Sequence, residues 1–150
     1  MLAILASLAA AASPPPVELP AIYKAAGATR RGAKWVLCAE EPNAEGLRVD
    51  LYRDLNGDGR PEVILTESGT FCYGRDEAGF ALLTKEASGG WRLMTSGSGI
   101  PEPLKTKGAA GYPDLSIGGP GFCFPVQRWN GREYANQRFE YEGKPCRPAR

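Results

Sequence analysis

The clearest pattern along the chain is an alternation of apolar and polar side chains that begins at Leu47. In the segment LRVDLYRD, Leu47, Val49 and Leu51 alternate with charged or amphipathic neighbours. A period of two residues is typical of a β-strand with one buried face. We therefore predict a strand here and further strands in EVILTES (62–68), TFCYG (70–74), GFALLTKE (79–86), WRLMTS (91–96), DLSIGG (114–119), FCFPVQRWN (122–130) and REYANQRFEYE (132–142).

A different pattern precedes these strands. In LPAIYKAAGA (19–28), Leu19 and Ile22 fall on one side of a helix, and Pro20 suits its first turn. This pattern predicts a short helix. The next apolar run, AKWVLCAE (33–40), fits either a strand or a second short helical piece.

Turn signals separate the strands. The Pro- and Gly-punctuated segment IPEPLKTKGAAGYP (100–113) predicts a long loop. The pair Asn130-Gly131 predicts a hairpin, because a type I′ turn needs positive φ at both central positions. Together the patterns predict a mainly β fold, an antiparallel sheet or a small barrel or sandwich, with one short N-terminal helix and disulfide links.

The first residues form a separate apolar segment. Residues 1–12 carry no charge, and they are too few to span a bilayer as a helix, which takes ~20 residues. The apolar run and the small residues before Ser13 are typical of a secretory signal, although no Lys or Arg precedes the run; an N-terminal tail or an internal helix is the alternative. We therefore divide the chain into a signal peptide (1–12), an extended spacer (13–18) and a single β-rich domain (19–150).

The four cysteines of an exported chain predict disulfide bonds and a periplasmic or secreted location. The chain has no CxxC spacing and no His, so a zinc site would have to gather four distant thiolates. The cysteines allow three pairings. We predict Cys72–Cys123 and Cys38–Cys146, because Cys72 and Cys123 both lie in strand-like segments rich in Phe and Gly.

Charge and composition exclude several classes of function. The net charge is +1, and the basic residues are scattered, so no nucleic-acid partner is predicted. The absence of His excludes a Ser-His-Asp triad, a Cys-His pair and a His-ligated metal. No phosphate-binding GxxxxGK[ST] motif occurs either.

The strongest chemical signature lies in DLNGDGRPEVIL. Counted from the first Asp, the side chains of Asp54, Asn56, Asp58 and Glu62 occupy positions 1, 3, 5 and 9, and position 7 offers the carbonyl of Arg60. Alternate residues in such a loop point inward, and Ca²⁺ prefers a shell of several hard oxygen ligands. We therefore predict a calcium site formed by these five residues.

This loop resembles the calcium loop of FG-GAP/VCBS-type repeats, in which a DxNxDGxxD/E hairpin loop leads into an apolar strand. It differs from an EF-hand, because Leu65 stands where a bidentate Glu closes that site, and strand patterns flank the loop. The resemblance implies a structural Ca²⁺ that joins two strands at their turn. Because the chain has a single copy of the loop, the family's multi-blade propeller is not implied. The alternative is a metal-free turn with its corner at Asn56 to Gly59.

Paired carboxylates are the remaining route to catalysis. Candidates outside the loop are Glu67, Asp76, Glu77 and Asp114, none of which lies in a motif. The segment GYPDLSIGGPGFCFPVQRWNGREY places five aromatic residues beside Gly and Pro. Such residues suit a contact surface for a protein or a glycan, or they pack in the core of a strand-rich domain.

These observations predict an extracytoplasmic, non-enzymatic binding or structural module with one structural calcium loop. Its partner, a protein or a glycan, is not specified by the sequence. Two alternatives stay open. The first is an inhibitor or immunity-type protein that inserts a loop such as GGPGF (118–122) into a cell-envelope enzyme. The second is a hydrolase that uses two carboxylates.

Overall fold

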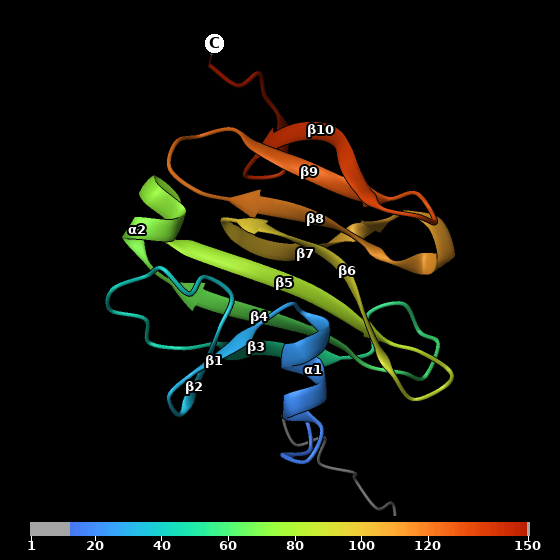
Figure 1. Ribbon diagram of the computed structural model, residues 1–150. Coiled ribbons are helices and arrows are strands. Elements are labelled where there is room, and N and C mark those ends of the chain that lie inside the picture. Colours follow the sequence, from blue (N-terminus) through green and yellow to red (C-terminus); the bar gives the residue numbers. More distant parts are fainter. Residues whose placement is uncertain (1–12, 150) are drawn as a thin grey trace, which may run out of the picture.

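The computed structural model describes residues 13–149, and they form three stacked layers (Figure 1). The signal peptide predicted for residues 1–12 lies outside the described residues. The middle layer is a four-stranded antiparallel sheet of β3 (Arg48–Arg53), β4 (Glu62–Ser68), β5 (Ala78–Lys85) and β6 (Trp91–Ser98), in that order.

The outer layers cover the two faces of this sheet. One is a five-stranded antiparallel sheet in the order β11 (Lys144–Pro145), β10 (Tyr134–Tyr141), β9 (Phe124–Trp129), β8 (Pro113–Gly118) and β7 (Ile100–Lys107). The other contains the helix α1 (Leu19–Ala25) and the hairpin of β1 (Thr29–Arg31) and β2 (Lys34–Val36). Short helices connect strands at α2 (Thr70–Tyr73), η1 (Gly74–Asp76) and η2 (Ala109–Gly111). The predicted mainly β, antiparallel fold with disulfides is confirmed.

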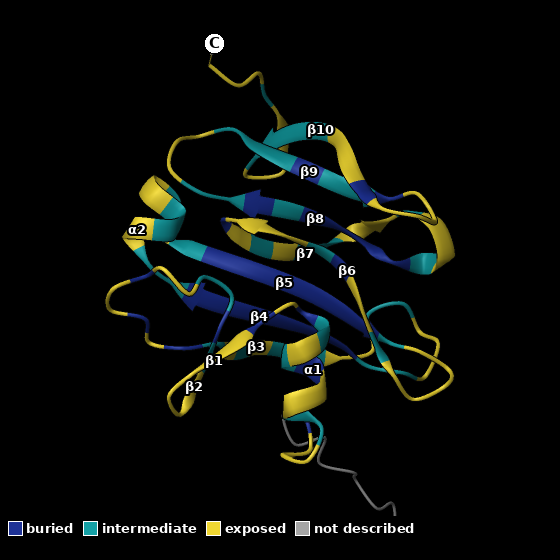
Figure 2. Ribbon diagram, viewed as in Figure 1, coloured by how far each residue is buried: buried dark blue, intermediate teal, exposed yellow. Residues whose placement is uncertain are grey.

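The middle sheet is buried on both faces. In β4, Val63 and Leu65 pack in one cluster with Ile22 of α1, whereas Ile64 packs in a second cluster with Leu115 of the five-stranded sheet. Figure 2 shows β4 and β5 as the most continuously buried strands. Burial of each aliphatic side chain stabilises the fold by about 1.5–3 kcal/mol. Apolar side chains on both faces therefore explain why the EVIL run does not alternate.

One predicted strand is a helix. The segment TFCYG forms α2 in the connection between β4 and η1. The carboxylate of Glu41 accepts hydrogen bonds from the amides of Phe71 (3.1 Å) and Cys72 (3.2 Å). These donors are satisfied by a side chain, so this segment joins no strand ladder.

One predicted loop contains a strand. The first part of IPEPLKTKGAAGYP forms β7, which pairs with β8 alone and is an edge of its sheet. Pro101 and Pro103 lack an N–H group, and such residues are tolerated where a strand has a free side. The two prolines are therefore compatible with an edge strand. The prediction of a long loop was wrong for the residues of β7.

The hairpin predicted at Asn130-Gly131 is present, but its turn is not type I′. Trp129 pairs with Tyr134, so the connecting loop has four residues, and Gly131 has a φ of 95° while Asn130 has no positive φ. The side-chain oxygen of Asn130 instead accepts hydrogen bonds from the amides two and three residues further on, both at 2.9 Å. The Asn thus closes the turn with its side chain.

The predicted extended spacer turns back onto the middle sheet. The amide of Glu18 donates to the carbonyl of Pro15 at 2.9 Å. The Glu18 carboxylate accepts hydrogen bonds from Nζ of Lys85 (2.9 Å) and Nε1 of Trp91 (3.0 Å). These contacts hold the start of α1 against β5 and β6.

The two disulfides join different cysteines from those predicted. The bonds are Cys38–Cys72 and Cys123–Cys146, so the predicted pairs Cys72–Cys123 and Cys38–Cys146 were wrong. Cys72 lies in α2 on the side of the middle sheet, whereas Cys123 precedes β9 in the other sheet. Similar local composition therefore did not indicate spatial proximity.

We expect non-reducing peptide mapping to recover these two pairs. The bonds span 34 and 23 residues, and each contributes about 3–4 kcal/mol in the chain-entropy description. The double variant Cys123→Ser/Cys146→Ser should therefore lower the free energy of unfolding by about 3 kcal/mol in urea titrations. A peptide that joins Cys72 to Cys123 would contradict the structure.

Candidate functional site

The acidic loop, residues 54–62 between β3 and β4, is organised by Asp54. One carboxylate oxygen of Asp54 accepts hydrogen bonds from the amides of Asn56 (3.2 Å) and Gly57 (2.8 Å), and the other accepts one from Gly59 (2.7 Å). Partial burial opposes ionisation, but the amide donors outweigh it and lower the pKa of Asp54. Asp54 therefore closes the corner that the chain makes at Asn56 to Gly59.

Two further side chains of the acidic loop have protein partners. Asp58 accepts a hydrogen bond from the amide of Arg60 at 2.8 Å and pairs with its guanidinium at 3.0 Å. The side-chain amide of Asn56 donates to the carbonyl of Ala110 in η2 at 3.3 Å. The second contact joins the acidic loop to the five-stranded sheet.

Glu62 lies inside the fold. Its carboxylate accepts hydrogen bonds from the amide of Leu55 (2.6 Å) and the hydroxyl of Thr84 (2.8 Å), and Thr84 lies 3.1 Å from the hydroxyl of Tyr112. Burial raises the pKa of Glu62, and the charges of the other loop carboxylates add to this shift. This chain of contacts joins the middle sheet to the five-stranded sheet.

The donor set of the acidic loop fits calcium in its chemistry, because carboxylate, amide and carbonyl oxygens are the hard ligands that this ion takes. The carboxylate oxygens of Asp54, Asp58 and Glu62 do not all lie within 4.8 Å of one another. Within residues 13–149, the one group of three His, Cys, Asp or Glu side chains with ligand atoms all within 4.8 Å is Cys38, Glu40 and Cys72. Its two sulfurs are joined in a disulfide, so this group is not a metal site. In this structure Asp58 pairs with Arg60, and both carboxylate oxygens of Glu62 accept hydrogen bonds from Leu55 and Thr84.

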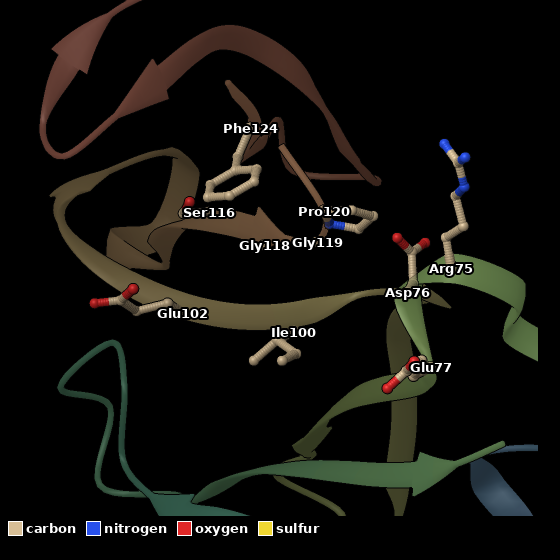
Figure 3. A pocket seen from close by; sticks show the side chains of 10 residues that line it. All are labelled: Arg75, Asp76, Glu77, Ile100, Glu102, Ser116, Gly118, Gly119, Pro120 and Phe124. Carbon is tan, nitrogen blue, oxygen red and sulfur yellow. The ribbon is translucent and has the colours of Figure 1, made fainter. Parts of the chain in front are cut away.

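The four other candidate carboxylates separate into two kinds. Glu67 is fully buried and accepts hydrogen bonds from the amides of Leu37 (2.6 Å) and Cys38 (3.0 Å), so its role is to hold the segment after β2. Asp114 is also fully buried. Asp76 and Glu77 instead line a surface cavity beside η1 (Figure 3).

Asp114 connects four strands of the five-stranded sheet. From β8 it accepts hydrogen bonds from the hydroxyl of Thr106 in β7 (2.6 Å), from Arg128 in β9 (two, both 2.9 Å) and from Arg138 in β10 (2.8 Å). Burial opposes its ionisation, but these donors outweigh burial and hold the pKa of Asp114 well below its usual range. Asp114 is the single charged residue of β8, but no motif in the sequence identified its partners.

The aromatic loop, residues 119–123 between β8 and β9, presents an apolar ring to solvent. Phe122 is 76% exposed. Its ring packs edge-on against Tyr141 with 5.4 Å between centroids, and the next residue is held by the disulfide to Cys146. Figure 1 places this loop near α2, at the opposite end of the sheets from the acidic loop. The loop is therefore both anchored and accessible.

Comparison with protein-family models, with curated proteins and with solved structures gives no match to this chain. Among the helices that the structure describes, none has the length and apolar character needed to cross a membrane. Two disulfides are typical of proteins in an oxidising, extracytoplasmic environment.

We expect Asp114→Asn to lower the free energy of unfolding at pH 7 by about 3 kcal/mol, because it leaves two guanidinium groups without their buried counter-charge. The wild-type contribution is present above the unfolded pKa of Asp, about 3.9, and is lost as pH falls through the lower folded pKa. Urea unfolding at pH 7 and pH 3 should therefore show a smaller acid-induced loss in the variant. An equal loss in both proteins would contradict this role.

Proposed function

We propose that this protein is an extracytoplasmic, non-catalytic binding module that recognises a protein partner through the aromatic loop. The observation that carries the proposal is the exposed ring of Phe122 on a loop fixed by a disulfide and by Tyr141. Aromatic anchors are enriched among the residues that dominate protein interfaces. A loop already held in one conformation loses little entropy on binding.

A second exposed apolar side chain lies close to the aromatic loop. Ile100 at the start of β7 is 60% exposed and lines one cavity with Gly119 and Pro120 of the loop, and Phe71 of the neighbouring α2 is 69% exposed. Gly119 of the aromatic loop lies next to Asp76 of η1. The approach is so close that a Cβ at position 119 would lie 2.8 Å from the Asp76 carboxylate. This end of the molecule therefore carries exposed apolar side chains from α2, from the start of β7 and from the aromatic loop, and such side chains favour an interaction surface.

A periplasmic or secreted location fits this proposal. The two disulfides persist in an oxidising compartment, and the apolar segment at residues 1–12 has the composition of a secretory signal. Export would place the aromatic loop where envelope or extracellular proteins are accessible.

The inhibitor function is a second candidate, favoured by the same rigid loop. Inhibitors of enzymes bind with little backbone change, so an anchored loop that ends in an exposed aromatic side chain suits a cleft. Catalysis has less support, because Glu67 and Asp114 are buried and engaged in structural hydrogen bonds. The carboxylates of the acidic loop also have protein partners.

We also propose that the acidic loop is a weak, structural calcium site. Asp54, Asn56, Asp58, the carbonyl of Arg60 and Glu62 would hold the ion, and its charge would relieve the repulsion between the carboxylates. The first half of the loop already has its corner fixed by Asp54. Because the loop is also closed by its own hydrogen bonds, we expect the protein to fold in EDTA.

A photo-crosslinking experiment tests the aromatic loop. With p-benzoylphenylalanine in place of Phe122, irradiation of cells that export the protein should give one discrete protein adduct. The same group in place of Val17, which is 85% exposed and outside the proposed surface, should give none. Phe122→Ala should change the free energy of unfolding by less than about 1 kcal/mol, because the ring is mostly exposed. An identical set of adducts from both positions would contradict the proposal.

Thermal unfolding in EDTA and in about 1 mM Ca²⁺ tests the calcium site. Wild-type protein should unfold at a higher midpoint with calcium, because the ion binds the folded loop. Asp58→Asn should lose this shift, whereas Asp50→Asn, an exposed acid of β3 outside the ligand set, should keep it. Equal midpoints for the folded wild type with and without calcium would contradict the calcium site and leave the loop as a hydrogen-bonded turn.

A further inference from the structure

A groove runs over the outer face of the five-stranded sheet, away from the middle layer. Two cavities, of about 540 and 430 Å³, meet there and share Glu102, Ser116 and Phe124. The first extends to Asp76 and Glu77 beside the aromatic loop, and the second extends to Glu140 and Glu142 at the end of β10. We call this combined surface the acidic groove.

In the first cavity of the acidic groove, apolar side chains lie between carboxylates. Figure 3 shows the Phe124 ring and the Ile100 side chain between Glu102 on one side and Asp76 and Glu77 on the other. The guanidinium of Arg75 lies beyond Asp76 in the same view. A ligand that crosses the first cavity therefore meets apolar surface flanked by carboxylates.

Three carboxylates of the groove form no ion pair within the described chain. Among residues 13–149, Asp76, Glu77 and Glu102 have no cationic partner, whereas Glu140 pairs with Arg138. The chain as a whole has a net charge of +1, so this concentration of acids is a local feature. The groove therefore offers negative charge that an incoming cation can neutralise.

The adjacent strand edge disfavours recognition by strand addition. β7 borders the groove as the edge of its sheet, and Pro101 and Pro103 remove two amide donors from it. Prolines on an edge strand oppose pairing with another chain. A bound segment is then recognised through its side chains on the face of the sheet.

We propose that the acidic groove binds an extended, lysine- or arginine-bearing segment of the protein partner. Long basic side chains fit this lining, because their aliphatic stems can lie on Ile100 and Phe124 while their charged ends reach Glu102, Asp76 or Glu77. A divalent cation fits less well, since no three of these carboxylates have ligand atoms within 4.8 Å of one another. This inference rests on the proposed binding function and specifies the chemistry of the partner.

Fluorescence anisotropy with labelled hexapeptides tests the proposal on the mature, oxidised protein. The probe Lys-Ala-Lys-Ala-Lys-Ala places every lysine on one side of an extended chain, and Glu-Ala and Ser-Ala repeats of the same length are the controls. The lysine peptide should bind more tightly than both controls. Raising the salt from about 20 to about 150 mM should weaken it, because exposed charges are screened.

A matched pair of variants locates the binding. Asp76→Asn/Glu102→Gln should weaken the lysine peptide by about 10-fold, since each exposed ion pair contributes a factor of about 2–5. Glu86→Gln/Glu133→Gln removes the same charge from exposed turns outside the groove, and binding should stay within about 1.5-fold of wild type. Equal thermal midpoints of both variants would show that folding is unchanged.

Several results would overturn the inference. One is that the lysine peptide binds no more tightly than the serine peptide, and another is that both double variants weaken its binding equally. A third is that a chitosan oligomer binds more tightly than the lysine peptide, which would assign the groove to a cationic glycan. If the lysine peptide fails but the adduct at position 122 forms, the cationic segment is wrong while the binding module stands. If the lysine peptide binds the groove but no adduct forms at position 122, the aromatic loop does not contact the partner, and the proposed role of Phe122 is wrong.

Discussion

The five-stranded sheet depends on a single buried carboxylate, that of Asp114. A charge without water is tolerated only where it is paired and hydrogen-bonded, and Asp114 meets this condition with Thr106, Arg128 and Arg138. Because these partners come from β7, β9 and β10, the carboxylate fixes four strands relative to one another. Arg138 extends the network to Glu140, which lines the acidic groove. The surface that we assign to binding therefore rests on this interaction.

The contacts at the two ends of the sheets have different roles. At one end, Glu62, Thr84 and Tyr112 join the middle sheet to the five-stranded sheet beneath the acidic loop. At the other end, the Cys123–Cys146 disulfide and Tyr141 hold the aromatic loop. The first set of contacts is directed inward and stabilises the fold. The second leaves the side chain of Phe122 facing solvent, where a partner can reach it.

The sequence predicted the fold class because local patterns report burial. The apolar run of β4 indicated a strand, since both of its faces are covered. The helix α2 could not be read from TFCYG, because its amide donors are satisfied by Glu41, which is 30 residues distant from Phe71 in the chain. The predicted disulfide pairs were wrong because pairing also depends on contacts between distant parts of the chain, namely on which sheet each cysteine adjoins.

The candidate site was predictable only in part. The spacing of Asp54, Asn56 and Asp58 predicted a calcium site, which stays a prediction, and the corner at Asn56 to Gly59 was the alternative. That Asp54 closes this corner, and that Glu62 contacts Thr84, could not be read from the sequence, because the second contact depends on the sheet register. The GGPGF segment was predicted as a loop, but its anchoring by the Cys123–Cys146 disulfide and by Tyr141 was not. The acidic groove was not identifiable, because Glu102, Phe124 and Glu140 come from three strands and share a face only after the sheet forms.

The decisive measurement is an NMR titration of the isotopically labelled, oxidised protein with the lysine-bearing hexapeptide. We expect the amide chemical shifts to change at Asp76, Glu77, Glu102 and Ser116 and in the aromatic loop, while α1 and the acidic loop stay unchanged. Such a map would place the binding surface on the sheet that Asp114 holds together. Changes confined to the acidic loop, or spread evenly over the molecule, would contradict that assignment.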